Sequence, residues 1–186
     1  MSDFTAIAAV TSTLKALLLQ QLPAIAVEET KTPLELGGST PMVGLYLYRA
    51  EMNPFTANMD WRPVTGTQLS APPFGVNLHY LITPYGPDEL EIQRTLGEVM
   101  RALHDHAVVR SGDPLLTAPL ADMTEELRIV PRMLPLGDMI DLWRSFDKMS
   151  YRLSVTYEVS TVLIDSGLTR NVARVQERVI DLRPAR

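Results

Sequence analysis

Residues 74–103 read FGVNLHYLITPYGPDELEIQRTLGEVMRAL, and this stretch decides what class of fold the chain adopts. Over 74–84 the alternation predicts a strand, with Val76, Leu78, Tyr80 and Ile82 on one face and Asn77, His79, Leu81 and Thr83 on the other. A turn follows, and Asp88 is placed to cap a helix, with Glu91 three residues later as its capping-box partner. The helix is expected to end near His106. A strand followed directly by an amphipathic helix indicates an α/β domain.

The same two periodicities predict two further helices and four further strands. Apolar residues recur at helical spacing over 4–22, where Pro23 ends the helix, and over 138–146. Pro131 lies inside one predicted strand, which favours an edge or a bulge for it. The last predicted strand is expected to be the longest and to lie in the centre of the sheet. The four strands are expected over 24–28, 42–51, 126–134 and 151–164.

The composition limits the functions that the chain can have. With 186 residues, 46% of them hydrophobic, it can bury one core without cross-links. The net charge of −5 argues against nucleic acid or an anionic membrane as partner. The absence of cysteine excludes disulfides, thiolate metal sites and cysteine nucleophiles. The N-terminus lacks a signal-peptide pattern, and no apolar run approaches the length of a membrane span, so we expect a cytoplasmic protein.

The histidines are the first residues to consider for catalysis or metal binding. His104 and His106 are two positions apart on a helix and point in different directions, so they do not form a metal site together. Histidines at a helix C-terminus are favoured by the helix dipole alone. His79 falls in the middle of a strand, where a sheet-face role is expected rather than that of a catalytic base. We therefore expect no catalytic site, no metal and no cofactor.

Two other segments carry side chains that are typical of protein interfaces. Residues 53–73 are proline-rich and are expected to form a long loop, and loops of this length are usually either functional or disordered. Tryptophan and arginine are enriched at binding hot spots. The tail beyond Ser166 is rich in arginine on an otherwise acidic chain, and both a solvated tail and an arm that clasps an acidic neighbour remain open, as does its strand or helix character. The candidate interface residues are Phe55, Met59, Trp61, Arg170, Arg174, Arg178, Val172, Val175 and Val179.

Three stretches, taken in order, form a pattern that spans most of the chain. They are residues 74–85 continued through 96–103, residues 136–146 around Leu142-Trp143, and YRLSVTYEV at 151–159. In this order they resemble the cap, or tail-terminator, family of extracellular contractile injection systems, which are phage-tail-like particles.

The resemblance implies a single-domain, tail-terminator-like α/β (α+β) fold, in which a mixed and mostly antiparallel sheet is flanked by two main helices. Independently of the resemblance, we expect a cap domain over 1–166, with the long loop at 53–73, and an extended C-terminal arm over 167–186. The implied function is a structural subunit, assembled in the cytoplasm into a particle that can be released. Copies of it would form a ring, expected to be a hexamer, on the distal end of sheath and inner tube, and the ring would end polymerisation. The alternatives are another tail-completion or neck protein, or a small hydrolase.

Overall fold

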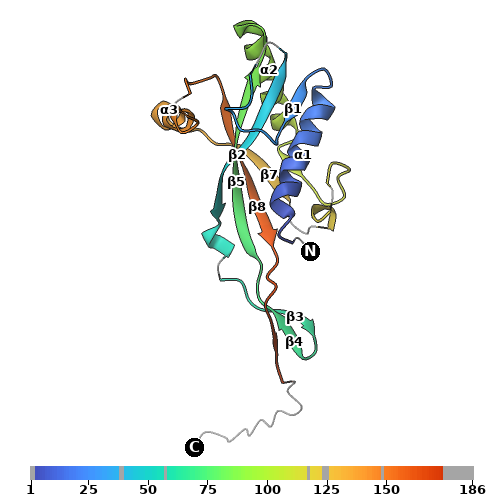
Figure 1. Cartoon of the computed structure of the whole chain (residues 1–186). Helices are drawn as coiled ribbons and strands as arrows, with labels where there is room; N and C mark the ends of the chain where they lie inside the picture. The colour runs from blue at the N-terminus through green and yellow to red at the C-terminus, as the bar shows by residue number, and fades with distance from the viewer. Residues whose placement is uncertain are drawn as a thin grey trace, which may run out of the picture.

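The chain forms a six-stranded sheet with helices on both faces, and a three-stranded sheet that projects from one end (Figure 1). The computed structural model describes residues 3–37, 40–56, 58–116, 118–122, 126–147 and 149–173. The helical elements are α1 (Ala6–Gln21), α2 (Glu89–Asp105) and α3 (Leu136–Arg144), with the short turns η1 (Pro54–Thr56) and η2 (Leu120–Asp122). The large sheet consists, in spatial order, of β1 (Ala26–Glu28), β2 (Met42–Met52), β5 (Phe74–Tyr85), β8 (Val155–Ile164), β7 (Leu127–Pro131) and β6 (Val108–Val109).

The centre of the sheet is β5, which pairs antiparallel with β2 on one side and with β8 on the other. Only β1 runs parallel to its neighbour, so the expected mixed and mostly antiparallel sheet is confirmed. The longest strand is β5, with 12 residues, whereas β8 is central but begins only at Val155. Pro131 is the last residue of β7, whereas the residues of this strand that pair with β6 are Leu127 and Arg128. The missing N–H of Pro131 therefore removes no hydrogen bond between β7 and β6.

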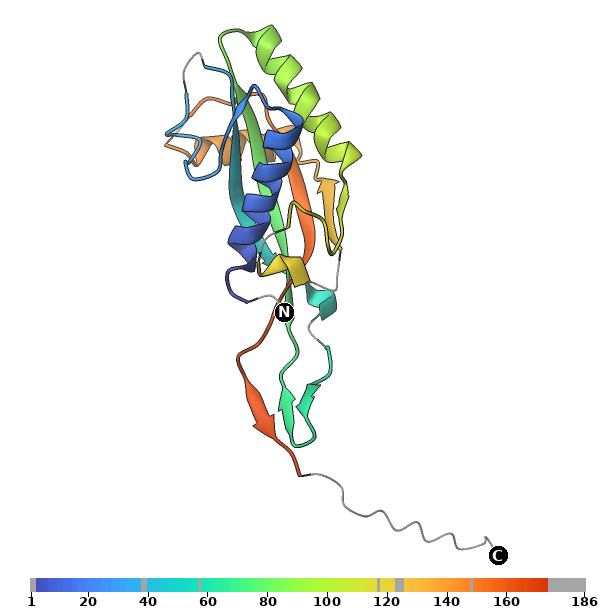
Figure 2. The same ribbon diagram turned by 90° about the vertical axis from the view of Figure 1, so that its right-hand side faces the viewer.

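Helices α1 and α2 cover one face of the large sheet, as Figure 2 shows. Asp88 caps α2 as predicted, because its side chain accepts a hydrogen bond from the Glu91 N–H at 2.9 Å. The hydroxyls of Thr11 in α1 and Tyr80 in β5 are hydrogen-bonded at 2.8 Å, and burial raises the pKa of Tyr80. The main core lies between these helices and the sheet. No helix in the described ranges is long and apolar enough to cross a bilayer.

Helix α3 lies on the opposite face, on the far side of the sheet from α1 in Figure 1. It is held by a second, smaller apolar cluster, in which Leu81, Met139 and Trp143 are buried. The indole N–H of Trp143 donates to the Ser154 hydroxyl at 3.1 Å, so the buried polar end of the ring has a partner. Successive residues of β5 therefore serve different cores, since Tyr80 faces α1 and Leu81 faces α3.

The smaller sheet, which we call the arm, consists of β3 (Arg62–Thr65), β4 (Gln68–Ser70) and β9 (Thr169–Asn171). Figures 1 and 2 show it extending away from the domain, below the end of the large sheet. It continues the central ladder: β4 leads into β5, and β9 follows β8. The hydrogen bond from Ala71 N to Leu168 O, at 2.8 Å, bridges the two pieces. Residues 53–73, expected as a loop, thus contain η1 and a hairpin.

Candidate assembly interface

The arm brings together candidate residues from two segments that are far apart in the sequence. The guanidinium carbon of Arg170 lies 4.2 Å from the centre of the Trp61 ring, which is a cation–π contact. Arg170 belongs to β9, and Trp61 immediately precedes β3. Trp61, Pro63 and the described residues 169–171 of the tail therefore belong to one surface feature, which the sequence indicated only as two separate candidates.

The remaining candidate residues occupy the arm and its base, or lie outside the described ranges. Phe55 sits in η1 with 94% of its surface exposed, and Met59 is 37% exposed. Val172 follows β9, and its N–H donates to the carbonyl oxygen of Thr67 at 2.9 Å. The predicted residues that fall outside the described part of the chain are Arg174, Val175, Arg178 and Val179.

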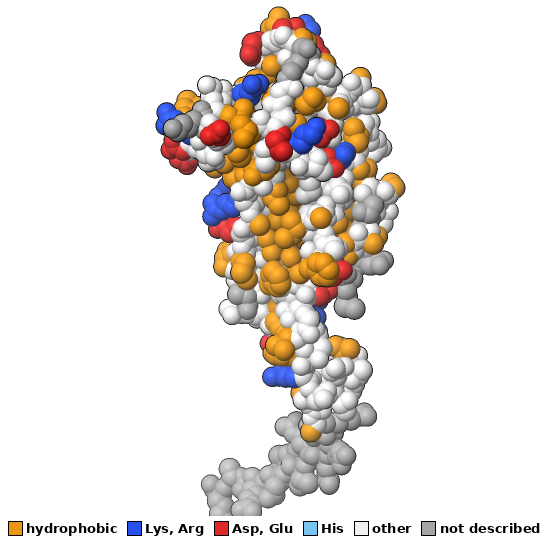
Figure 3. Space-filling model, viewed as in Figure 1, with side chains coloured by type: hydrophobic (Ala, Val, Ile, Leu, Met, Phe, Trp, Pro, Cys, Tyr) orange, Lys and Arg blue, Asp and Glu red, His pale blue; other side chains and the backbone are white. Residues whose placement is uncertain are grey.

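The arm has side chains and strand edges exposed on both faces. Every residue of β3 and β9 is exposed, including Val64 at 57%, and Leu168 just before β9 is 61% exposed. Figure 3 shows hydrophobic side chains gathered in the middle of the domain's face and scattered along the arm. A short three-stranded sheet without a core of its own is marginal in water. These properties are typical of an element that is covered by a partner.

The two outer edges of the arm differ in their ability to accept another strand. Leu168, Arg170 and Val172 alternate along β9 and direct their backbone groups towards β4. The N–H and C=O groups of Thr169 and Asn171 therefore point to the free side, where no described strand pairs with them. On the other edge, Pro63 in β3 has no N–H to donate, and the β3–β4 pairing is irregular after it. Strand addition is thus favoured on the β9 side.

The arm leaves the domain through a tightly packed neck around Gly75. The Gly75 N–H donates to Thr56 Oγ1 at 2.8 Å, and the Asn53 N–H donates to Gly75 O at 2.8 Å. A Cβ atom on Gly75 would lie 2.6 Å from Thr161 Cγ2 and 2.7 Å from Thr56 Cγ2. The absence of a side chain at Gly75 therefore lets η1, which carries Phe55, close against β5 and β8.

Replacing Gly75 by alanine is expected to destabilise the protein by about 1–3 kcal/mol, because the added methyl group overpacks the neck. Denaturant unfolding measures this change. Gly97 in α2 is the matched control, because a Cβ there meets nothing within 4 Å. Gly97→Ala is expected to raise stability by about 0.5–1 kcal/mol, since alanine favours the helix. Equal effects of the two changes would contradict the role given to the neck.

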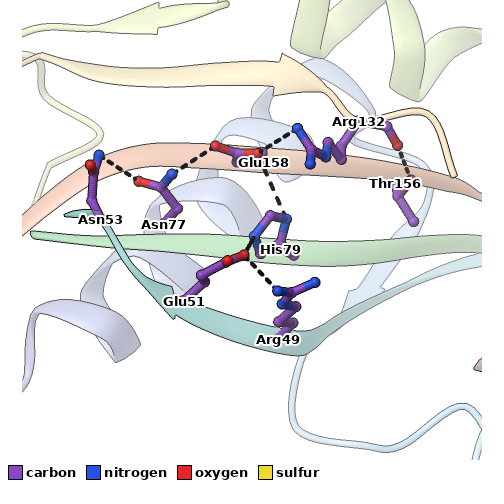
Figure 4. Close-up of polar contacts among 8 residues, drawn as sticks. All are labelled: Arg49, Glu51, Asn53, Asn77, His79, Arg132, Thr156 and Glu158. Atoms are coloured by element: carbon purple, nitrogen blue, oxygen red, sulfur yellow. Dashed lines mark hydrogen bonds and ion pairs between the residues drawn. The ribbon is translucent and has the colours of Figure 1, made fainter. Parts of the chain in front are cut away.

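A polar cluster, unforeseen from the sequence, lies on the sheet face opposite α1 (Figure 4). His79, buried in β5, has Nε2 3.5 Å from Glu51 Oε2 and Nδ1 3.8 Å from Glu158 Oε2. Each carboxylate also has an arginine, with Arg49 2.9 Å from Glu51 and Arg132 3.6 Å from Glu158.

The polar cluster ties together the central strands, because its members come from β2, β5, β8 and the segment after β7. Asn77 continues it by donating to Glu158 Oε1 at 2.9 Å, and Asn53 donates to Asn77 Oδ1 at 3.2 Å. Burial raises the pKa of the neighbouring Tyr48, whose ring lies 6.0 Å from that of His79. Paired opposite charges of this kind are typical of a structural network.

The other histidines lie at the end of α2, as the sequence predicted. His104 is exposed on the last turn, and His106 caps the helix with its ring Nδ1 3.0 Å from the carbonyl oxygen of Ala102. Among the residues that the structure describes, no group of three or more His, Asp or Glu side chains is placed to hold a metal ion.

The fold and the arm define the chain as a small α+β domain with a projecting ribbon of exposed strands. It belongs to the Pvc16 N-terminal domain family, whose model matches residues 9–178. The resemblance found in the sequence is thereby confirmed. Comparison with curated proteins gives no match.

Two solved structures have the same fold. One is the sheath/tube terminator of PVC, an extracellular contractile injection system, in its extended state. It matches with a TM-score of 0.71 and 20% identity, over 100% of this chain and 65% of that chain. The other is the tube-terminating cap of the anti-feeding prophage, with a TM-score of 0.64 and 17% identity, over 99% of this chain and 62% of that one. This chain thus spans less than two thirds of the length of either relative.

Proposed function

We propose that this chain is the capping domain of a terminator in a contractile injection particle. Copies of it form a ring, expected to be a hexamer, on the distal end of the inner tube and sheath, and the ring ends polymerisation. The role is structural and needs no cofactor. Family membership and the shared fold of two tube terminators support this class of function. Assembly takes place in the cytoplasm, before any release of the particle.

The observation that carries the proposal is the arm. A closed ring requires two different faces on each subunit, one to bind each neighbour, and a ring that seats on a filament needs a third contact. The arm supplies a face that is separate from the domain, with an open strand edge at Thr169 and Asn171 and an exposed Val64, and the exposed Phe55 of η1 lies at its base. Main-chain pairing at an edge and side chains in neighbouring pockets together give affinity and specificity.

The test is to assemble tube and sheath proteins with and without this chain and to measure particle lengths by negative-stain electron microscopy. We expect overlong tubes of variable length without it, and uniform tubes with a density at one end when it is added. Uniform lengths in both samples would contradict a terminator. Particles of normal length that fail to contract, or that lack a head-proximal structure, would instead indicate a tail-completion or neck protein.

A further inference from the structure

A groove of about 640 Å³ lies between the base of the arm and the N-terminal end of the domain. Pro63 and Val64 of β3 and Ala71 and Pro73 after β4 give it apolar walls. Its charged side chains are Asp3, Arg62 and Asp165. Within the described ranges, the buried Oδ2 atom of Asp165 has no hydrogen-bond partner, which is unfavourable for a carboxylate unless a donor reaches it.

The chain carries a segment whose chemistry matches this groove. Residues 172–182 combine Val172, Val175 and Val179 with two arginines and two acidic residues. Residues 174–186, which include the end of this segment and the chain beyond it, contain four arginines against Glu177 and Asp181. Residues 174–186 therefore carry +2 and residues 1–173 carry −7, since the total is −5, while within 172–182 the two arginines are balanced by the two acidic residues. Arginine matches a carboxylate with two donors in a fixed geometry, valine fits the apolar walls, and Glu177 can pair with Arg62.

The direction of β9 decides which molecule the segment reaches. Asn171 pairs with Gln68, next to the turn at 66–67, so β9 ends at the tip of the arm and points away from its own groove. Figure 2 shows this end of β9 far from the domain. Residues 172–182 contain neither glycine nor proline, the residues that most favour a tight reversal. Ten extended residues span about 35 Å, which is long enough to reach a neighbouring subunit.

We propose that the groove at the base of the arm binds the arginine- and valine-rich segment 172–182 of a second copy of this chain. Arg174 or Arg178 of that copy pairs with Asp165, and its valines cover Val64 and the prolines. The inference rests on the proposed ring, because such donation is head-to-tail and leads from subunit to subunit. The groove and the segment 172–182 would then be the two different faces that each subunit of a closed ring requires.

The absence of cysteine makes a disulfide-pairing test clean. Full-length chains carrying Val64→Cys are mixed with chains carrying Val175→Cys, alone and on assembled particles, and are oxidised briefly. We expect at least about tenfold more mixed dimer than with Val130→Cys in place of Val64→Cys, because binding raises the local concentration of the two thiols. Val130 is the matched control, since it is a comparably exposed valine (49%) on β7, away from the arm.

Charge exchange provides a second readout. Asp165→Arg and Arg178→Asp, each alone, are expected to reduce the mixed dimer about tenfold, and the two together to restore it. A double-cysteine chain that forms only an internal disulfide would place the segment in its own groove and overturn the proposal. So would mixed dimer no greater than the Val130 control in both samples. Tube length, measured in parallel, separates failure of this contact from failure of the capping function.

Discussion

Replacing Trp143 by alanine is expected to lower the free energy of unfolding by about 3–5 kcal/mol, the range for removing a buried tryptophan from a core. Trp143 is fully buried on α3, packs against the ring of Phe146 at 6.0 Å, and donates its N–H to Ser154. The change leaves a cavity on the α3 face of the sheet and leaves the Ser154 hydroxyl without this donor. Guanidinium or urea unfolding of the purified chain measures the loss.

The control for this change is Met133→Ala, because Met133 precedes the same helix but is 91% exposed. It is expected to alter stability by less than about 0.5 kcal/mol. Trp143→Phe keeps the apolar contacts but removes the donor, so an intermediate loss is expected. If Trp143→Ala unfolds like the unchanged protein, α3 is not held by the second apolar cluster, and the division of β5 between two cores is wrong.

The strands and helices of the domain could be read from the sequence because packing against the cores imposes a regular spacing of apolar side chains, even in β5, which is buried on both faces. The alternation from Val76 to Ile82 and the cap at Asp88 are local signals, and both predicted the correct element. The length of the last strand was wrong, since residues 151–154 precede β8 without pairing in it. Ser154 there accepts from the indole of Trp143 instead, and that contact depends on a helix ten residues earlier in the chain.

The arm was harder to predict because neither of its faces is buried by the chain itself. The hairpin over 62–70 lacks the alternation that burial imposes, and its strands are only four and three residues long. The Thr65-Gly66 pair, at the start of the turn between Val64 and Leu69, was the one available signal. Its third strand comes from the other end of the chain. The contact of Trp61 with Arg170 depends on that pairing, so the sequence indicated the residues but not their contact.

The polar cluster illustrates a second limit. Glu51, His79 and Glu158 each look like an ordinary polar position on the second face of a strand, and nothing local distinguishes them. Their meeting depends on strand order and on a bulge in β2 between Leu47 and Arg49, which brings Arg49 opposite His79. Register of this kind is set by the whole sheet, so a single strand does not reveal it.

Truncating the chain after Ser166 is expected to reduce the fraction of capped tubes about 100-fold. The reduction is large because the loss of affinity at one contact is repeated at every subunit of the ring. The truncation removes β9, and with it the open edge at Thr169 and Asn171 and the partner of Trp61. The melting temperature of the domain is expected to change by less than about 3 °C, because β9 pairs only with β4 in the arm. Tube lengths in the assembly assay and thermal unfolding of the purified chain provide the two readouts.

The matched control is truncation after Ala173, which keeps β9 and its pairing with β4 but removes the basic segment that follows. We expect this shorter deletion to weaken contacts between copies while the arm still binds the tube end, so capping falls less than after Ser166. Equal loss in the two truncations would assign the whole effect to residues 174–186 and remove β9 from the interface. Normal capping by the Ser166 truncation would show that the arm does not bind the filament, and the domain face would then have to supply that contact.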